Sequence, residues 1–419
     1  MQNIVISIQG RRPLTGDVTV AGAKNAALPD LAAVCLSGEA IEFSNVPQVE
    51  DIKVMFAALR EIGALGEMRG DLIRVAIPEI RSDEVSQGIV RTTRASILLL
   101  GPMLARHGRA KVTLPGGCAI GERKIDFHLQ GLQRMGAEIR SEREFLEARC
   151  RRLRGIEYSF PARTVTGTEN LLMAAVLAEG TTVLHNCALE PEVEDLVVLL
   201  RDMGADIAGA SDGTWIIRGR TALHGARHRV IPDRIEAGTY LMAGCLAGNE
   251  IHVQGVVPEH LGSLLDVLGA MGAAVSVFPQ ALHVRGGAAL AAADLVTAPF
   301  PGFPTDLQAQ ATALLTQAEG VSRVRETIFN DRFHHVRELR RLGADIVVKG
   351  DTAVVRGRSP LRGATLRTTD LRASAALVLG ALAAEGETVI ENSYQLFRGY
   401  ENLPEKLQKL GADITIRRE

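Results

Sequence analysis

A sixfold internal repeat is the feature that most constrains how this chain can fold. A helical apolar pattern that ends in Gly-Ala and runs at once into a strand pattern recurs along the sequence, with its glycines at positions 63, 136, 204, 272, 343 and 411. Successive glycines lie 73, 68, 68, 71 and 68 residues apart. Glycine is favoured after a helix because it adopts a left-handed backbone without steric cost. The period therefore indicates copies of one supersecondary unit.

A second series of glycines interleaves with the first, at positions 38, 108, 180, 248, 320 and 386. Each ends an Ala- and Leu-rich helical segment and precedes a short β-branched strand. A unit of about 70 residues then holds two helices and several short strands, and it exceeds the roughly 20 to 50 residues of common solenoid repeats. Six βαβ-type copies predict an α/β fold. The Ala-rich helices are apolar nearly all round, which places them inside, with sheets outside them.

The length of the chain predicts two domains with three repeats each. A chain of 419 residues exceeds the size at which one hydrophobic core stops growing. The middle of the repeat series falls near residues 224–238. We therefore expect one domain over residues 22–231 and a second over residues 1–21 and 232–419, completed by the N-terminal strand. A cleft between the two domains is the expected substrate site.

Composition excludes several classes of function. The formal net charge of -2 argues against a general nucleic-acid or membrane-surface role. No uncharged apolar run is long enough to span a membrane, and the N-terminus lacks the pattern of a signal peptide. The five cysteines form no CxxC or Cys/His cluster, and the ten histidines show no ligand spacing with carboxylates. We predict a cytoplasmic protein with no disulfide framework, metal site or cofactor.

The segment AGAKNAALP places Lys24 and Asn25 beside a glycine turn at the start of a predicted helix. The positive end of a helix dipole helps such a lysine to meet an anionic group. A solvated lysine and an asparagine helix cap explain the same pattern, so this motif alone does not decide its role.

The segment LPGGCAIGERKIDFH surrounds Cys118 with glycines, which indicates an exposed loop. Arg123 and Lys124 follow closely, and cations lower the pKa of a nearby thiol and make it reactive. The alternative is a small apolar filler at a turn. Buried, apolar surroundings fit Cys35 and Cys245 better than they fit Cys118.

Isolated arginines recur at predicted strand-to-helix junctions: Arg94, Arg332, Arg372 and Arg398. Together with Lys24 and Arg123 they come from five of the six repeats at comparable positions. A cation at a helix start opposes the helix dipole, and arginine suits bidentate recognition of phosphate and carboxylate. The recurrence therefore predicts a convergent anion pocket, although a surface ion pair explains any single arginine.

Asp306 lies in PGFPTDLQAQ, where two prolines make a rigid entry to a predicted helix. One interpretation is a general base that takes a proton from a sugar hydroxyl. The other is an N-terminal helix cap or first-turn acid. Asp51 and Asp370 occupy similar positions in their repeats and are candidates to orient nearby arginines.

At these motifs the chain resembles the enolpyruvyl transferases over essentially its full length. The resemblance rests on motifs in the family's order and spacing: GAKNAALP, TTRAS, LPGGCAIGER, EPEVED, IPDRIEAGT, GFPTDLQAQ, ETIFNDRF, DLRAS and RGYE. The cysteine of the PGGC loop is typical of the members that act on UDP-N-acetylglucosamine, and it is not expected in the sister enzyme of the shikimate pathway.

The resemblance implies two inside-out α/β barrel domains, each built from three βαβαββ units, that close over the substrates. It implies that Lys24 and Asn25 contact phosphoenolpyruvate, with Lys24, Cys118, Asp306 and Arg398 as the catalytic set. The resemblance implies an anion pocket formed by Arg94, Arg123, Arg332, Arg372 and Arg398. It also implies that the nucleotide sugar is bound by Arg123, Lys124, Ile125, Asp126, Phe127, Thr164, Val165, Thr166, Gly167 and Ile328.

The implied reaction is transfer of the enolpyruvyl group from phosphoenolpyruvate to the 3-hydroxyl of UDP-N-acetylglucosamine, the first committed step of peptidoglycan synthesis. Cys118 would protonate the methylene carbon or hold the adduct, and the epoxide antibiotic fosfomycin would alkylate it. Asp306 would take the hydroxyl proton. Two alternatives stay open at this point: a paralogue that acts on a different nucleotide or sugar, and an inactive regulator that binds a nucleotide sugar.

Overall fold

The computed structural model describes residues 4–86, 95–113, 125–142, 145–210, 212–287 and 289–418. These residues form two compact units. Unit 1 takes them from Met1–Ala21 and Pro232–Glu419, and unit 2 takes them from Gly22–Gly117 and Arg123–Ile231. Each unit has its own hydrophobic core.

One repeat of unit 2 shows the βαβαββ plan in full. Its elements follow the order β9 (Glu157–Ser159), α6 (Val165–Ala175), β10 (Thr181–His185), α7 (Pro191–Asp202), β11 (Asp206–Ala210) and β12 (Thr214–Arg218). Strands β9 and β10 pair in parallel, with α6 as the crossover helix. Strand β12 then inserts antiparallel between β10 and β11. The predicted βαβαββ unit is therefore confirmed.

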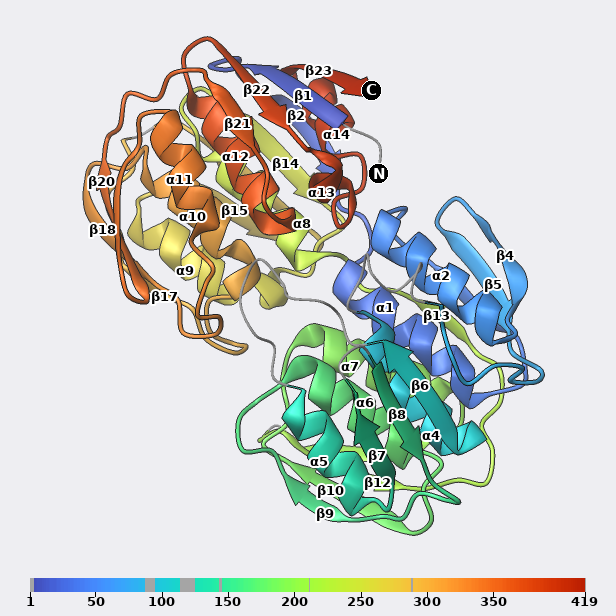
Figure 1. The fold of residues 1–419 in the computed structure, drawn as a ribbon. Helices are drawn as coiled ribbons and strands as arrows, with labels where there is room; N and C mark the ends of the chain where they lie inside the picture. The colour runs from blue at the N-terminus through green and yellow to red at the C-terminus, as the bar shows by residue number, and fades with distance from the viewer. Residues whose placement is uncertain are drawn as a thin grey trace. The chain divides into compact units, whose positions relative to one another are not determined.

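The rest of unit 2 follows the same plan (Figure 1). Its helices are α1 (Lys24–Ala33), α2 (Glu50–Ile62), α4 (Leu100–His107) and α5 (Asp126–Arg134), with short 3-10 turns at Val34–Leu36 and Ala95–Leu99. Its strands are β3 (Ile41–Ser44), β4 (Leu65–Arg69), β5 (Leu72–Ala76), β6 (Arg109–Thr113), β7 (Glu138–Ser141), β8 (Phe145–Arg149) and β13 (Arg227–Arg229). They form the sheets β13-β3-β5-β4 and β6-β8-β7.

Unit 1 contains three four-stranded sheets, β15-β16-β14-β2, β17-β18-β20-β19 and β21-β22-β1-β23. The helices are α8 (Arg234–Gly244), α9 (Gly262–Ala270), α10 (Gln308–Leu315), α11 (His334–Arg341), α12 (Leu371–Ala383), α13 (Tyr394–Phe397) and α14 (Leu403–Lys409), with 3-10 turns at Pro258–Leu261 and Thr305–Leu307. The strands are β1 (Ile4–Gln9), β2 (Thr15–Thr19), β14 (Glu250–Gln254), β15 (Ala274–Phe278), β16 (Ala281–Arg285), β17 (Leu295–Val296), β18 (Gly320–Arg325), β19 (Asp345–Lys349), β20 (Thr352–Gly357), β21 (Thr365–Arg367), β22 (Glu387–Glu391) and β23 (Asp413–Arg418).

Three strands complete repeats that lie far away in the sequence. Strand β1 pairs antiparallel with both β22 and β23, and Figure 1 shows it as a blue strand among red ones. Strand β2 pairs in parallel with β14, and β13 pairs in parallel with β3. The two ends of the chain are thus joined through backbone hydrogen bonds within unit 1.

The Ala-rich helices form the interior of each unit, as their sequences predict. Helices α6, α8, α10 and α12 bury residues on all sides, whereas α2 and α11 bury one face. Of the twelve repeat glycines, all except Gly38 have positive φ, between 76° and 125°. The steric argument for glycine after each helix is therefore confirmed at eleven positions.

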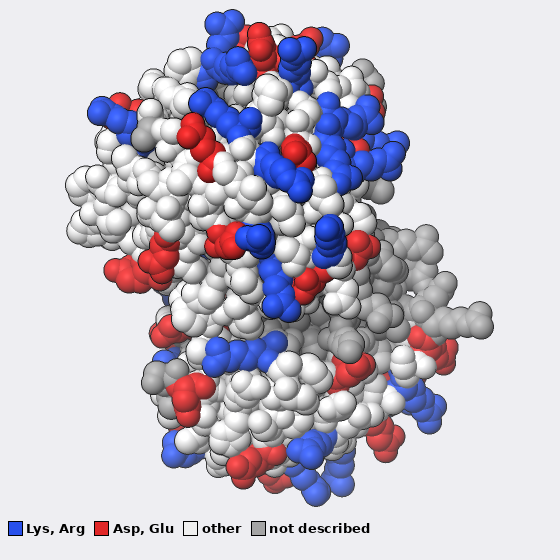
Figure 2. Space-filling model, turned by 90° about the vertical axis from the view of Figure 1, so that its left-hand side faces the viewer, with Lys and Arg blue, Asp and Glu red and all other residues white. Residues whose placement is uncertain are grey.

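No helix in the described part of the chain is long and apolar enough to cross a membrane. On the face that Figure 2 shows, basic and acidic side chains are interspersed with uncharged ones. This distribution agrees with the small formal net charge of -2.

Candidate active site

Asp306 lies between two buried arginines of unit 1. Its Oδ1 accepts a hydrogen bond from Arg332 Nη2 at 2.7 Å, and its Oδ2 accepts from Arg372 Nη2 at 2.8 Å and from Arg372 Nε at 3.1 Å. The arginine side chains are 4 % exposed and Asp306 is 23 % exposed. The carboxylate is therefore held by both neighbours while part of it still faces solvent.

The sequence positions these three groups from three different elements. Asp306 sits in the 3-10 turn that leads into α10, after the predicted Pro-rich entry. Arg332 lies two residues before α11, and Arg372 is the second residue of α12. Asp370 caps α12, because its Oδ1 accepts from the backbone N–H groups of Arg372 at 2.9 Å and Ala373 at 3.0 Å. Asp370 thus fixes the backbone that carries the arginine.

A buried acid that the sequence analysis missed supports this cluster. Thr305 Oγ1 accepts from Arg332 Nη1 at 2.7 Å and donates to Glu326 Oε2 at 2.8 Å. Glu326 Oε1 also accepts from the backbone N–H groups of Ile328 at 2.8 Å and Phe329 at 3.1 Å. Glu326 therefore holds Thr305, the hydrogen-bond partner of Arg332 Nη1, and also the backbone of the predicted contact residue Ile328.

A second missed residue, Tyr400, lies under the other arginine. The Arg372 guanidinium carbon is 5.4 Å from the centre of the Tyr400 ring. The Tyr400 hydroxyl accepts from Gln310 Nε2 at 2.8 Å and bonds Thr239 Oγ1 at 3.1 Å. Tyr400 belongs to the RGYE motif, which predicts no role for it, because its burial depends on contacts with α8 and α10 that the sequence does not reveal.

The cluster is suited to bind an anion. Burial lowers the pKa of Arg372, but the charge of Asp306 outweighs this effect and raises that pKa, so the guanidinium stays charged. Among the described residues, Arg332 Nε and Arg372 Nη1 are buried without a hydrogen-bond acceptor. A buried donor that lacks an acceptor costs about 1–3 kcal/mol. Phosphate or carboxylate oxygens are acceptors that would satisfy such groups.

Arg398, the third predicted anion-pocket arginine of unit 1, does not lie where the sequence predicts. Arg398 follows the four-residue helix α13 as its C-terminal cap, and its Nη1 donates to Gln395 Oε1 at 3.1 Å. The expectation of a helix start is therefore wrong for Arg398, because an additional helical turn precedes it. Ile328, which is predicted to bind the nucleotide sugar, also belongs to unit 1, and it is 37 % exposed to solvent.

In unit 2, Lys24 is the first residue of α1, as predicted, and Asn25 follows it. Lys24 Nζ lies 3.4 Å from Asp51 Oδ2 at the start of α2. Both side chains are largely buried, with 12 % and 6 % exposure. The carboxylate therefore fixes the ammonium group near the helix start.

The two segments predicted to bind the nucleotide sugar meet at His128. Asp126 and Phe127 begin α5 directly after Ile125, and Thr164 caps α6 by accepting from the N–H of Gly167 at 3.3 Å. His128 bonds Thr166 Oγ1 and Asn170 Nδ2, each at 3.3 Å. Because an amide nitrogen only donates, Nδ1 of His128 accepts and its Nε2 carries the proton toward Thr166.

A glycine allows the two helices to approach this closely. A Cβ on Gly131 of α5 would lie 2.4 Å from Leu171 Cδ1 of α6. Burial lowers the pKa of His128 to about 4, so the bridging imidazole is neutral at neutral pH. His128 was not predicted as a site residue, although it directly follows a predicted binding segment.

Four predicted residues lie outside the described residues: Arg94, Cys118, Arg123 and Lys124. The other cysteines with described positions agree with structural roles. Cys35 and Cys245 are buried, and burial raises the pKa of each thiol to about 12. Neither therefore has the lowered pKa of a reactive thiol.

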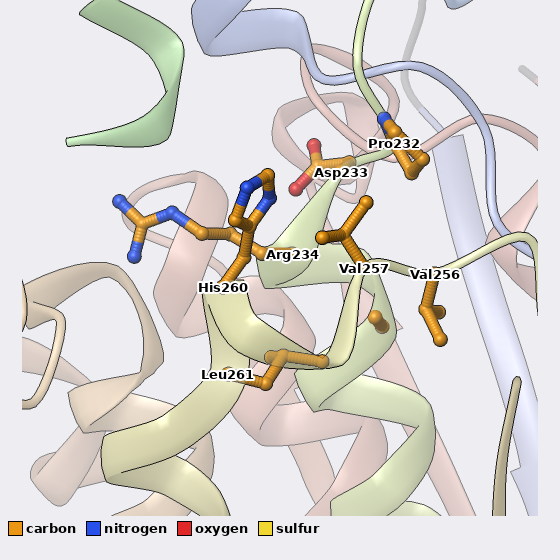
Figure 3. A pocket seen from close by; sticks show the side chains of 8 residues that line it. Pro232, Asp233, Arg234, Val256, Val257, His260 and Leu261 are labelled. Carbon is orange, nitrogen blue, oxygen red and sulfur yellow. The ribbon is translucent and has the colours of Figure 1, made fainter. Parts of the chain in front are cut away.

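A small pocket opens beside the start of α8 (Figure 3). Its lining includes Asp233, Arg234 and His260, together with apolar side chains of Val256, Val257 and Leu261. The Asp233 carboxylate caps α8. None of the residues that line this pocket belongs to the predicted substrate-binding set.

Comparison with known proteins decides the family. A family model described as EPSP synthase (3-phosphoshikimate 1-carboxyvinyltransferase) matches residues 8–407. The chain belongs to this enolpyruvyl transferase family. Relatives named UDP-N-acetylglucosamine 1-carboxyvinyltransferase include those of Koribacter versatilis, 50 % identical over 97 % of this chain and 95 % of that protein, and of Anaeromyxobacter sp. strain K, 51 % identical over 98 % of each.

Solved structures of enolpyruvyl transferases share the fold of this chain. The enolpyruvyl transferase NikO from Streptomyces tendae matches with a TM-score of 0.91 at 28 % identity, over all of both chains. EPSP synthase from Acinetobacter baumannii matches with a TM-score of 0.77 at 18 % identity, also over all of both chains. The predicted fold class, two domains with three βαβαββ-type repeats each, is confirmed. The chain is an enzyme of the enolpyruvyl transferase type.

Proposed function

We propose that this enolpyruvyl transferase moves the enolpyruvyl group of phosphoenolpyruvate to the 3-hydroxyl of UDP-N-acetylglucosamine and releases phosphate. This is the first committed step of peptidoglycan synthesis, and we expect the enzyme to act in the cytoplasm. The names of relatives at 50 % and 51 % identity support the choice of acceptor. The sequence motifs listed for the resemblance, above all the PGGC loop, support the same choice.

The observation that carries the proposal is the pairing of one part-exposed carboxylate with two buried guanidinium groups. Asp306 keeps 23 % exposure and so remains accessible to an incoming hydroxyl. The unsatisfied donors of Arg332 and Arg372 offer hydrogen bonds to phosphate or carboxylate oxygens of the donor substrate. A base and anion-binding groups beside it are what this transfer requires.

In the proposed reaction, the 3-oxygen of the sugar attacks C2 of phosphoenolpyruvate. Asp306 takes the hydroxyl proton, and Cys118 supplies a proton to C3, which gives a tetrahedral adduct. Loss of a C3 proton and breakage of the bond from C2 to the phosphate oxygen then yield the enol ether and phosphate. As charge moves, the anionic groups would be held by Lys24, Asn25, Arg94, Arg123, Arg332, Arg372 and Arg398.

The nucleotide sugar would bind mainly at the start of α5 and α6. Residues 125–127 and 164–167 lie together through the His128 bridge. The N-terminus of α6 offers backbone N–H groups near Thr164 and Val165, and helix N-termini favour phosphate groups. Arg123, Lys124 and Ile328 would complete this binding set.

Phosphate release with defined acceptors tests the proposal. We expect release from phosphoenolpyruvate only when UDP-N-acetylglucosamine is present, and none with UDP-glucose, which lacks the acetamido group. Release with another acceptor alone would favour the paralogue. No release with any acceptor, together with retained binding of the nucleotide sugar, would favour the inactive regulator.

A further inference from the structure

A cluster of histidines and a glutamate lies on one sheet of unit 1, apart from every residue assigned to the proposed reaction. Glu250 and His252 come from β14, and His283 comes from the neighbouring strand β16. Each residue offers one nitrogen or oxygen ligand atom, and these three atoms lie within 4.8 Å of one another. His252 is exposed, while Glu250 and His283 are half-buried.

Strand register creates this cluster. His252 and His283 are direct partners in the antiparallel pair of β14 and β16. Directly opposed residues point to the same face of a sheet. The imidazole rings of His252 and His283 accordingly stack, with their centroids 4.1 Å apart. On the other side of β14, the parallel strand β2 places Asp17 in register with His252. One row of the sheet therefore reads Asp17, His252 and His283.

The carboxylate of Glu250 is held toward the histidines. His283 Nε2 lies 3.1 Å from Glu250 Oε1, and Arg285 Nη2 donates to both carboxylate oxygens, at 2.9 and 3.1 Å. Arg285 therefore orients the Glu250 carboxylate beside His283, where an oxygen can act as a metal ligand.

These groups form the donor set that zinc and similar ions prefer. Imidazole nitrogens and a carboxylate oxygen bind Zn²⁺ at about 2.0–2.2 Å, so the three ligand atoms would move closer together around a shared ion.

We propose that Glu250, His252 and His283 form a binding site for a divalent transition-metal ion such as Zn²⁺ or Ni²⁺. Three protein ligands leave a further coordination position for water or for the carboxylate of Asp17. Because the ligands come from two strands, a bound ion cross-links β14 and β16. Linear spacing of histidines did not predict the site, because the two histidines are 31 residues apart and meet only through strand pairing.

Isothermal titration of Ni²⁺ and of Zn²⁺ into the chelator-treated full-length protein tests the proposal. We expect one ion per chain in the wild type. His252→Ala and His283→Ala should each weaken binding by roughly tenfold or more, as changes around metal ligands commonly do. The ion should also raise the urea midpoint of the wild type but not of the double variant.

His185→Ala is the matched control. His185 also pairs with a glutamate, Glu157, at 3.1 Å, but its partner in the neighbouring strand is Ser159 rather than a second histidine. Binding should be unchanged in this variant, and any binding to thiols is common to all variants. The proposal is overturned if the wild type binds no ion, or if the His252→Ala/His283→Ala double variant binds as tightly as the wild type while keeping wild-type circular dichroism.

Discussion

At the scale of single residues, Asp306 has to serve two purposes with one carboxylate. Its single negative charge offsets part of the positive charge of the buried Arg332 and Arg372, and in the proposed reaction it also accepts a proton. Its three hydrogen bonds from guanidinium groups orient it strongly. A base held in this way is positioned before the substrate arrives, which is how a preorganised site lowers a barrier.

Asp306→Asn should lower kcat by about 10²–10⁴-fold, because the amide keeps the shape but cannot accept the proton. The KM for phosphoenolpyruvate should change much less than kcat. Steady-state phosphate release measures both quantities. Asp370→Asn is the control, since asparagine caps a helix as well as aspartate does. A kcat within threefold of wild type would contradict the role assigned to Asp306.

Arg372→Lys should raise the KM for phosphoenolpyruvate by about 10- to 100-fold, because lysine cannot offer the planar fork that arginine presents. The KM for UDP-N-acetylglucosamine should move little. Comparing the two KM values separates loss of anion binding from general damage. Equal increases in both would argue that Arg372 supports the fold rather than the donor substrate.

Fosfomycin should add one covalent adduct at Cys118 when the nucleotide sugar is present, because it mimics phosphoenolpyruvate and carries an epoxide. Intact-mass measurement of the wild type and of Cys118→Ser detects the adduct. The buried thiols of Cys35 and Cys245, whose pKa values burial raises to about 12, should remain unmodified. An adduct of equal yield in Cys118→Ser would show that another residue reacts.

At the scale of elements, helix starts carry much of the proposed site. Helix α12 begins with the Asp370 cap and presents Arg372 in its first turn. Helix α6 begins with the Thr164 cap and α1 begins with Lys24. The Asp370 and Thr164 caps fix where α12 and α6 begin, and so they fix which side chains stand in the first turn of each helix.

Asp370→Ala should destabilise the protein by about 1 kcal/mol, because two backbone N–H groups of α12 lose their acceptor. The KM for phosphoenolpyruvate should rise as well, since Arg372 lies directly in this first turn. Urea unfolding and steady-state kinetics measure the two effects. If Asp370→Ala is as stable as Asp370→Asn, the cap does not contribute as described.

The bridge between α5 and α6 should depend on pH. The pKa of His128 falls from an ordinary 6.5 to about 4 on burial. Between these values the unfolded chain binds a proton that the native state does not. The free energy of unfolding should therefore fall as pH falls from about 6.5 to 4, with His128 contributing on the order of 3 kcal/mol.

His128→Gln should remove this contribution, and urea unfolding at pH 7 and pH 4.5 measures it as a difference from wild type. His335 of unit 1 acts in the same direction, because burial lowers its pKa to about 4 as well. Its contribution is present in both proteins and cancels in the comparison. Identical pH dependence of the two proteins would contradict the burial of a neutral His128.

At the scale of the whole molecule, the sequence predicted the repeat architecture well because each repeat carries its own local signals. Positive φ at eleven of the twelve repeat glycines follows directly from their place after helices. The entry to α10 at Asp306 and the start of α1 at Lys24 were likewise local features.

What the sequence could not predict depends on contacts between distant segments. Glu326, Tyr400 and His128 are polar residues whose partners come from other elements, so no periodic pattern marks them. The parallel pairing of β13 with β3 joins segments about 185 residues apart. The prediction of a helix start at Arg398 is wrong because no local signal marks the extra turn α13.

The position of the transferred group on the product tests the central claim most directly. The enzyme is incubated with UDP-N-acetylglucosamine and phosphoenolpyruvate labelled with ¹³C at C2, and the product is analysed by NMR. We predict a labelled enol ether whose carbon couples to the sugar proton on C3. Label on any other oxygen, or free labelled pyruvate released without an ether, would contradict the account.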